Sequence, residues 1–112
     1  MAPTLSNEIL LKAAKEYSTP LYVYDEERIH FQYSKLTHAF RKSDVKIFYA
    51  CKALSNINIL NILQKLGSGI DCVSLNEVQF ALKAGFEPHN IIFTPNSVSI
   101  DDYKEAASLL SL

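Results

Sequence analysis

From Val45 onward, the chain alternates short apolar runs with segments whose apolar residues recur at helical spacing. Runs that start near Val45, Ile70 and Ile91 predict three strands, and each run is followed by a stretch with the period of an amphipathic helix. After Lys46 the first run is apolar on both faces, which is typical of a parallel strand covered on both sides. This rhythm predicts an α/β fold built from βα units.

Polar residues mark the ends of the helices in these units. Ser55 is placed to cap the first helix, and Gly67 to end it with a left-handed residue. Ser74 and Glu77 have the spacing of a capping box that opens the second helix. Ser99 is placed to cap a last helix after the third strand. The capping signals therefore predict the same boundaries as the apolar pattern.

The segment that precedes these units predicts two helices and one short strand. Apolar residues recur at helical spacing over residues 7–17, and a Ser-Thr-Pro run then stops the pattern. Residues 21–24 have the composition of a short strand. Asp25 is placed to cap a second helix, with Arg41 and Lys42 in its last turn, where cations suit the carbonyl end.

Units of this kind build either an open, doubly wound sheet or a closed barrel, and the pattern alone does not choose between them. A complete eight-unit barrel needs about 250 residues. The 112 residues, 48% of them apolar, suffice for one compact domain and leave room for only about three or four such units. If the fold is a barrel, we expect this chain to form part of one.

Charge and cysteine content narrow the functional classes. The 11 Lys and Arg nearly balance the 12 Asp and Glu and are scattered along the chain, which argues against recruitment of nucleic acid. The start lacks a signal segment and no apolar run approaches a membrane span, so we expect a soluble, cytoplasmic protein. Cys51 and Cys72 lie 21 positions apart, without a CxxC pair or histidines at ligand spacing. We therefore expect two buried thiols in strands, with no metal site and no disulfide.

Lys52 stands at the carboxyl end of the first predicted strand, the end at which parallel α/β folds place their active sites. Strand alternation predicts that it shares a face with Phe48 and Ala50, and the small Ala50 leaves room for a flat ligand. An amine among apolar groups has a lowered pKa, so more of it is the neutral nucleophile that condenses with a carbonyl group. By position alone, a solvated lysine without a role is the commoner alternative.

Several motifs occur in a fixed order from Thr19 to the end of the chain. They are Thr19-Pro20-Leu21-Tyr22-Val23-Tyr24-Asp25, Tyr49-Ala50-Cys51-Lys52-Ala53 with Ser55-Asn56, Gly69-Ile70-Asp71-Cys72-Val73-Ser74 with Glu77, Ala84-Gly85 and Ile91-Ile92-Phe93. Together they resemble the N-terminal region of the fold-type III pyridoxal-phosphate-dependent decarboxylases, and among these the diaminopimelate decarboxylases most closely. The resemblance implies a TIM-like (β/α)8 barrel of the alanine racemase and decarboxylase type, incomplete in this chain.

The resemblance also implies how the whole enzyme is arranged. Residues 1–24 would form a helix and a strand that pairs with a C-terminal β domain absent from this chain, and residues 25–112 would form the first units of the barrel. The cofactor would be pyridoxal 5'-phosphate, and the active enzyme a homodimer with sites completed across the interface. The implied reaction is the decarboxylation of meso-2,6-diaminopimelate to L-lysine and CO2.

Three residues match positions of the family's cofactor site. Lys52 matches the lysine that binds pyridoxal phosphate covalently, Ala50 a position beside the cofactor, and Asp71 an acidic residue near that lysine. Without the resemblance, Asp71 is an ordinary polar residue at a strand end. Many members have Asn after Lys-Ala, where this chain has Leu54. The phosphate-binding loops and the acidic partner of the ring nitrogen would lie beyond Leu112, so we expect the isolated chain to be inactive.

Other functions are compatible with the same residues. An ornithine or arginine decarboxylase, or an alanine racemase, would use an equivalent lysine within the same fold. From other classes, the chain would be a non-catalytic pyridoxal-phosphate-binding protein, or an α/β interaction module without a cofactor. The predicted strand at residues 21–24 favours the decarboxylases, because a barrel without a second domain has no evident use for it.

Overall fold

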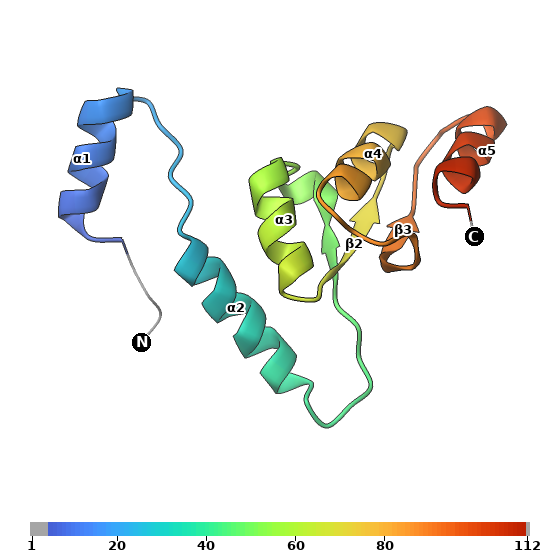
Figure 1. The fold of residues 1–112 in the computed structure, drawn as a ribbon, viewed down its shortest axis with the longest axis horizontal. Coiled ribbons are helices and arrows are strands. Elements are labelled where there is room, and N and C mark those ends of the chain that lie inside the picture. The colour runs from blue at the N-terminus through green and yellow to red at the C-terminus, as the bar shows by residue number, and fades with distance from the viewer. Residues whose placement is uncertain (1–4, 112) are drawn as a thin grey trace. The chain divides into compact units, whose positions relative to one another are not determined.

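The computed structural model describes residues 5–111, which fall into two compact units that divide after Ser43 (Figure 1). The first unit contains the helices α1 (Asn7–Tyr17) and α2 (Glu26–Ala39). The second contains, in chain order, β1 (Phe48–Ala50), the 3-10 turn η1 (Cys51–Ala53), α3 (Ile57–Lys65), β2 (Gly69–Cys72), α4 (Leu75–Lys83), the 3-10 turn η2 (Pro88–Asn90), β3 (Ile91–Phe93) and α5 (Ile100–Leu109). No helix within residues 5–111 combines the length and the apolar composition needed to cross a membrane.

Both helices of the first unit begin at side-chain caps. The Ser6 hydroxyl and the Asp25 carboxylate each accept a hydrogen bond from a backbone N–H of the first turn, at 3.2 and 3.1 Å. The predicted helix over residues 7–17 and the predicted cap at Asp25 are therefore confirmed. Arg41 and Lys42 lie beyond the end of α2, so their predicted place in its last turn is wrong. The helix ends earlier because its backbone tightens there to hydrogen bonds between residues three apart.

Residues 21–24, predicted as a strand, pair with no strand among the described residues. All four side chains are exposed, from 39% at Leu21 to 87% at Tyr22. A strand requires a partner for its ladder hydrogen bonds, and the described part of this chain offers none. The strand assignment is therefore wrong for this chain by itself.

The second unit is built on a three-stranded parallel sheet in the order β1-β2-β3. Helix α3 packs against α4, and α4 also contacts β2, β3 and α5 (Figure 1). The sheet is open at β1 and β3 and does not close into a barrel. The α/β fold and the strands predicted near Ile70 and Ile91 are confirmed.

β1 is shorter than the apolar pattern predicts. It begins at Phe48 instead of near Val45, which is 49% exposed. Phe48 is in register with Gly69, the first residue of β2. The chain just before Gly69 is still turning back from α3 through Gly67, whose φ is +86°. No strand therefore lies opposite the residues before Phe48, although they are apolar enough to form one.

Three fully buried side chains lie in the core of the second unit. Leu60 of α3, Ile70 of β2 and Val78 of α4 are each 0% exposed. Burying an aliphatic side chain of this size stabilises a fold by about 1.5–3 kcal/mol relative to leaving it exposed. α3, β2 and α4 each therefore contribute a fully buried side chain to the core of the second unit.

Side-chain caps set where α3 and α4 begin. Asn56 caps α3, accepting a backbone N–H at 3.0 Å, so the prediction of Ser55 was one residue early. Ser74 caps α4 as predicted, with its hydroxyl accepting the Glu77 N–H at 3.2 Å. The Glu77 carboxylate accepts from the N–H of Val73 at 2.7 Å, one residue before the cap. Glu77 therefore ties the end of β2 to the start of α4.

Gly69 occupies a position where a side chain would not fit. A Cβ built on Gly69 would overlap the Phe48 ring and lie 2.9 Å from its Cγ. We expect Gly69→Ala to lower the free energy of unfolding by about 1–3 kcal/mol, the usual cost of overpacking. Urea denaturation measures this change. In the Gly69→Ala background, Phe48→Leu is expected to restore part of the loss, and a double-mutant cycle without coupling would contradict the account.

Candidate functional site

Lys52 is presented at the carboxyl edge of the sheet by η1, immediately after β1. The neighbouring Cys51 is fully buried, and the Tyr49 hydroxyl donates to the Leu54 carbonyl at 3.2 Å across the turn. The Lys52 side chain is exposed, and within residues 5–111 its ammonium has no hydrogen-bond or ion-pair partner. The short η1 turn is thus held in place and presents a primary amine to which no described residue binds.

The position of Lys52 differs from the prediction in two respects. The backbone leaves the strand at Cys51, whose carbonyl accepts the N–H of Leu54 at 3.2 Å. Strand alternation therefore stops before Lys52 and no longer decides on which face of the sheet its side chain lies. Its exposure also contradicts the predicted apolar surroundings of the amine, because the described residues leave it in contact with solvent.

Asp71 lies beside Ala50 at the same edge of the sheet. Parallel pairing of β1 and β2 puts the two residues in register, and both are half-buried. The Asp71 carboxylate accepts a hydrogen bond from the hydroxyl of Thr94, which directly follows β3. The structure thus gathers Ala50, Asp71 and the turn of Lys52 at the carboxyl ends of adjacent strands. Thr94 was missed from the sequence, where its only signal is its place after the third strand.

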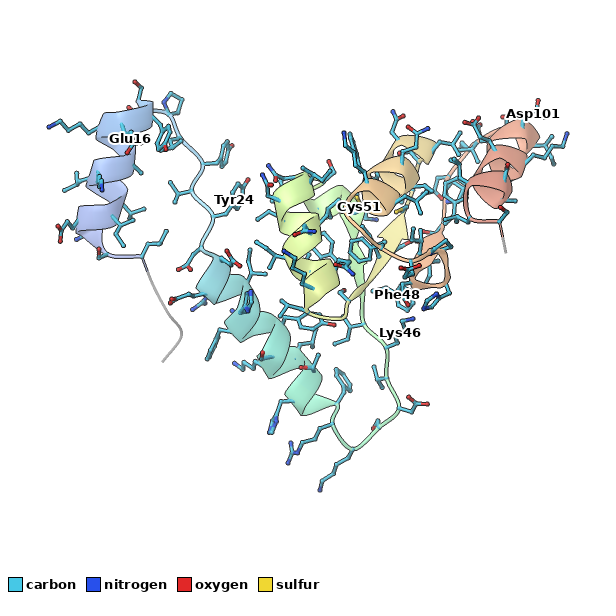
Figure 2. The ribbon with its side chains drawn as sticks, viewed as in Figure 1. Glu16, Tyr24, Lys46, Phe48, Cys51 and Asp101 are labelled. Carbon is cyan, nitrogen blue, oxygen red and sulfur yellow. The ribbon has the colours of Figure 1, made fainter. Side chains whose placement is uncertain are left out.

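Lys46 provides a contrast to Lys52 within the same segment. It lies before Phe48, at the opposite end of β1 from Cys51 (Figure 2). Its ammonium donates a hydrogen bond to Asn90 Oδ1 and lies 5.2 Å from the centroid of the Phe48 ring. Lys46 is therefore held by its neighbours, whereas the described residues leave the amine of Lys52 unengaged.

Cys51 and Cys72 are both fully buried, as predicted, and both are free. Cys72 lies in β2, but Cys51 falls in η1, so its predicted place in a strand is wrong. Burial raises the pKa of the Cys51 thiol to about 11 and that of Cys72 to about 12, and the nearby Glu77 carboxylate adds to both shifts. Both thiols are therefore protonated at neutral pH and weak nucleophiles.

These raised pKa values predict a loss of stability in alkali. An unfolded thiol has a pKa of about 8.5, whereas the folded thiols have pKa values of about 11 and 12. Below about pH 8.5 both states keep their thiols protonated, and the free energy of unfolding is unaffected. As the pH rises from about 8.5 toward the folded pKa values, the unfolded thiols lose their protons first, and the folded state loses stability. Between those limits we expect each thiol to lower the free energy of unfolding by up to about 1.4 kcal/mol per pH unit. Urea denaturation at several pH values measures the slope. The double variant Cys51→Ala, Cys72→Ala is expected to flatten it, and an unchanged slope would contradict the account.

Comparison with known proteins identifies the family. Residues 26–109, which include Ala50, Lys52 and Asp71, match the family described as "Pyridoxal-dependent decarboxylase, pyridoxal binding domain". The chain belongs to this family. The amine of Lys52, at the edge of the sheet, lies within the matched segment.

Individual relatives of this chain agree with the family assignment. Diaminopimelate decarboxylase of Methanothermobacter thermautotrophicus is 47% identical over 98 residues, which cover 86% of this chain and 23% of the relative. The crystal structure of diaminopimelate decarboxylase from Helicobacter pylori complexed with L-lysine matches with a TM-score of 0.80 at 39% identity, over 94% of this chain and 26% of that one. Lysine/ornithine decarboxylase from Vibrio vulnificus complexed with putrescine matches with a TM-score of 0.85 over 95% of this chain and 30% of that one. At 24% identity, this last match bears on the fold alone.

The chain spans about a quarter of the length of the diaminopimelate decarboxylases that it matches. Its resemblance to the N-terminal region of the fold-type III decarboxylases is confirmed by these relatives. Its open sheet of three parallel strands corresponds to part of their barrel domain.

Proposed function

We propose that this chain is the part of a diaminopimelate decarboxylase that anchors pyridoxal 5'-phosphate, with Lys52 as the residue that binds the cofactor. The observation that carries the proposal is the exposed amine of Lys52, which pairs with no described residue and stands at the carboxyl edge of a parallel sheet. Parallel α/β folds bind their ligands at this edge. The family match of the surrounding segment supports the choice of cofactor.

The residues around Lys52 fit this cofactor. A primary amine is the group that condenses with an aldehyde, with the loss of one water molecule. The small side chain of Ala50 leaves space at the sheet edge, and the hydroxyl of Thr94 holds the carboxylate of Asp71 in a fixed orientation there. When bound, pyridoxal phosphate supplies a conjugated ring that takes up the electron pair left by a departing carboxylate.

The proposed reaction removes one carboxylate of meso-2,6-diaminopimelate as CO2, and a proton takes its place to give L-lysine. The 47% and 39% identities to two diaminopimelate decarboxylases support this substrate. The second of these was crystallised with L-lysine. The complete enzyme is proposed to be a homodimer, as the family resemblance implies, and to lie in the cytoplasm.

A chimera tests the proposal. The segment of the Helicobacter pylori enzyme that this chain matches is replaced by this chain, a graft supported by their TM-score of 0.80. The purified chimera is expected to release CO2 from meso-2,6-diaminopimelate and to require pyridoxal phosphate for it. A soluble chimera that has the circular dichroism spectrum of the parent enzyme but releases no CO2 would contradict the proposal.

The isolated 112-residue chain is expected to release no CO2 from meso-2,6-diaminopimelate. It spans only about a quarter of its relatives, so it carries the anchor but little of what must position the substrate. A coupled assay for CO2 measures this directly, with the chimera as the positive control. Turnover by the isolated chain in excess of a blank with pyridoxal phosphate alone would refute the expectation.

A further inference from the structure

A second cluster of chemically active side chains lies outside the site of Lys52. It consists of Cys51, Cys72 and Glu77. Two Sγ atoms and one carboxylate oxygen, one from each residue, all lie within 4.8 Å of one another. The three residues come from η1, β2 and α4, so the cluster is assembled by the tertiary fold. Their spacing in the sequence matches no local metal-binding motif.

The cluster lies on the face of the sheet opposite to Asp71. Asp71 and Cys72 are consecutive residues of β2, and successive side chains of a strand point to opposite faces. Cys51 follows Ala50, the register partner of Asp71, which explains why Cys51 comes to lie beside Cys72. Neither cysteine has a task in the proposed decarboxylation.

The third member of the cluster is already held in position. The N–H of Val73 donates to Glu77 Oε2 at 2.7 Å, and the other carboxylate oxygen accepts no hydrogen bond from the described residues. Glu77 stands in the first turn of α4, where the positive end of the helix dipole stabilises negative charge. The cluster therefore combines two buried sulfur atoms with one oriented carboxylate.

The dimensions of the cluster suit a tetrahedral metal ion. Zinc binds sulfur at about 2.3 Å and carboxylate oxygen at about 2.0–2.2 Å, which places two sulfur ligands about 3.8 Å apart. The 4.8 Å span exceeds that separation by only about 1 Å. We propose that Cys51, Cys72 and Glu77 bind one thiophilic divalent cation of the zinc and cadmium class. Sulfur ligands select such cations over Mg²⁺ and Ca²⁺.

Binding is a simple exchange of protons for a cation. Two S–H bonds lose their protons to solvent, two metal–sulfur bonds and one metal–oxygen bond form, and no electron is transferred. The assembled group retains a single net negative charge beside the N-terminus of α4. Because burial keeps both thiols protonated at neutral pH, the affinity is expected to rise by up to about 100-fold per pH unit.

Titration of the reduced 112-residue chain with CdCl2 tests the site. The ultraviolet charge-transfer absorption of cadmium–thiolate bonds reports the occupied site and is not produced by histidine or carboxylate ligands alone. We expect the signal to saturate at one cation per chain, to be lost on addition of excess Zn²⁺ and to be unaffected by Mg²⁺. Absence of a saturable signal at one equivalent would overturn the proposal.

Two variants and a control separate metal binding from packing. Cys72→Ala is expected to weaken Cd²⁺ binding by at least about 100-fold, because it removes one of two sulfur ligands. Glu77→Gln keeps an oxygen that can accept the N–H of Val73, so the start of α4 is preserved while the anionic ligand is lost. We expect this variant to bind at least about tenfold more weakly. Glu105→Gln changes an exposed residue of α5 and is expected to leave binding unchanged.

The outcome of these titrations decides between a metal site and ordinary packing of two thiols. Unchanged affinity in Cys72→Ala, or in Glu77→Gln with a native circular dichroism spectrum, would overturn the proposal. If Cys72→Ala does not fold, the comparison of Glu77→Gln with Glu105→Gln decides the question. As a second readout, one equivalent of Zn²⁺ is expected to raise the melting temperature of the unmodified chain more than that of Glu77→Gln.

Discussion

Replacing Lys52 by arginine in the chimera is expected to reduce the release of CO2 from meso-2,6-diaminopimelate by at least about 10³-fold. Arginine keeps a positive charge and a long aliphatic stem, but its guanidinium remains protonated and does not condense with an aldehyde. The η1 turn is held by Tyr49, Cys51 and Leu54, so the exposed side chain can change without loss of the fold. Steady-state measurement of CO2 release at saturating substrate gives the ratio of rates.

The matched control for this experiment is Lys65→Arg. Lys65 is an exposed lysine at the end of α3 and lies outside the edge where Lys52 and Asp71 meet. The same chemical change there is expected to leave the rate within about twofold. Equal rates for the two chimeras would show that Lys52 does not carry the cofactor.

Leu60→Ala is expected to lower the free energy of unfolding of the isolated chain by about 2–5 kcal/mol. The Leu60 side chain is 0% exposed and belongs to the same core as Ile70 and Val78. Removing its branched end leaves a cavity that the sheet and the adjacent helices can fill only in part. Small domains have a free energy of unfolding of about 5–15 kcal/mol, so this substitution is expected to remove a large share of it. Urea denaturation followed by circular dichroism measures the change.

Leu11→Ala provides the control for burial. Leu11 of α1 is 71% exposed, so the same substitution there removes almost no packing and is expected to change the free energy of unfolding by less than about 0.5 kcal/mol. Similar effects at Leu11 and Leu60 would mean that Leu60 is not packed in the core as described.

The order and type of most elements could be predicted from local patterns. The first helix spans the predicted residues 7–17, because apolar spacing and the following Ser-Thr-Pro run both lie within one segment. Ser99 caps α5 as predicted and forms a reciprocal capping box with Asp102. Gly67 and Gly85 both have positive φ values near the ends of helices, where left-handed residues are expected. Signals of this kind need no information from distant parts of the chain.

The errors arise where distant residues decide the structure. The strand predicted at Val45 is shortened because its partner begins only at Gly69. Residues 21–24 form no strand, because a strand needs a second one beside it. The proximity of Cys51 and Cys72 follows from the register of β1 and β2, which neither segment encodes alone. Local sequence spacing contains no information about which strands pair or in which register.

The candidate site was only partly predictable from the sequence. The rule that parallel strands end at one edge predicts that Lys52 and Asp71 meet there, and the register of Ala50 with Asp71 agrees with it. The 3-10 turn that exposes Lys52 was not predicted, because strand alternation was extended two residues past the end of β1 at Ala50. The hydrogen bond from Thr94 to Asp71 spans two strands and could not be inferred without their register.

Reduction with borohydride in the presence of pyridoxal phosphate, followed by peptide mass analysis, tests the central claim most directly. Borohydride makes the bond between a lysine amine and the cofactor permanent, so the modified residue can be read from the fragment masses. At substoichiometric pyridoxal phosphate we expect the label on Lys52, and its loss in Lys52→Arg. A label distributed among exposed lysines such as Lys65 and Lys83, without preference for Lys52, would contradict the account.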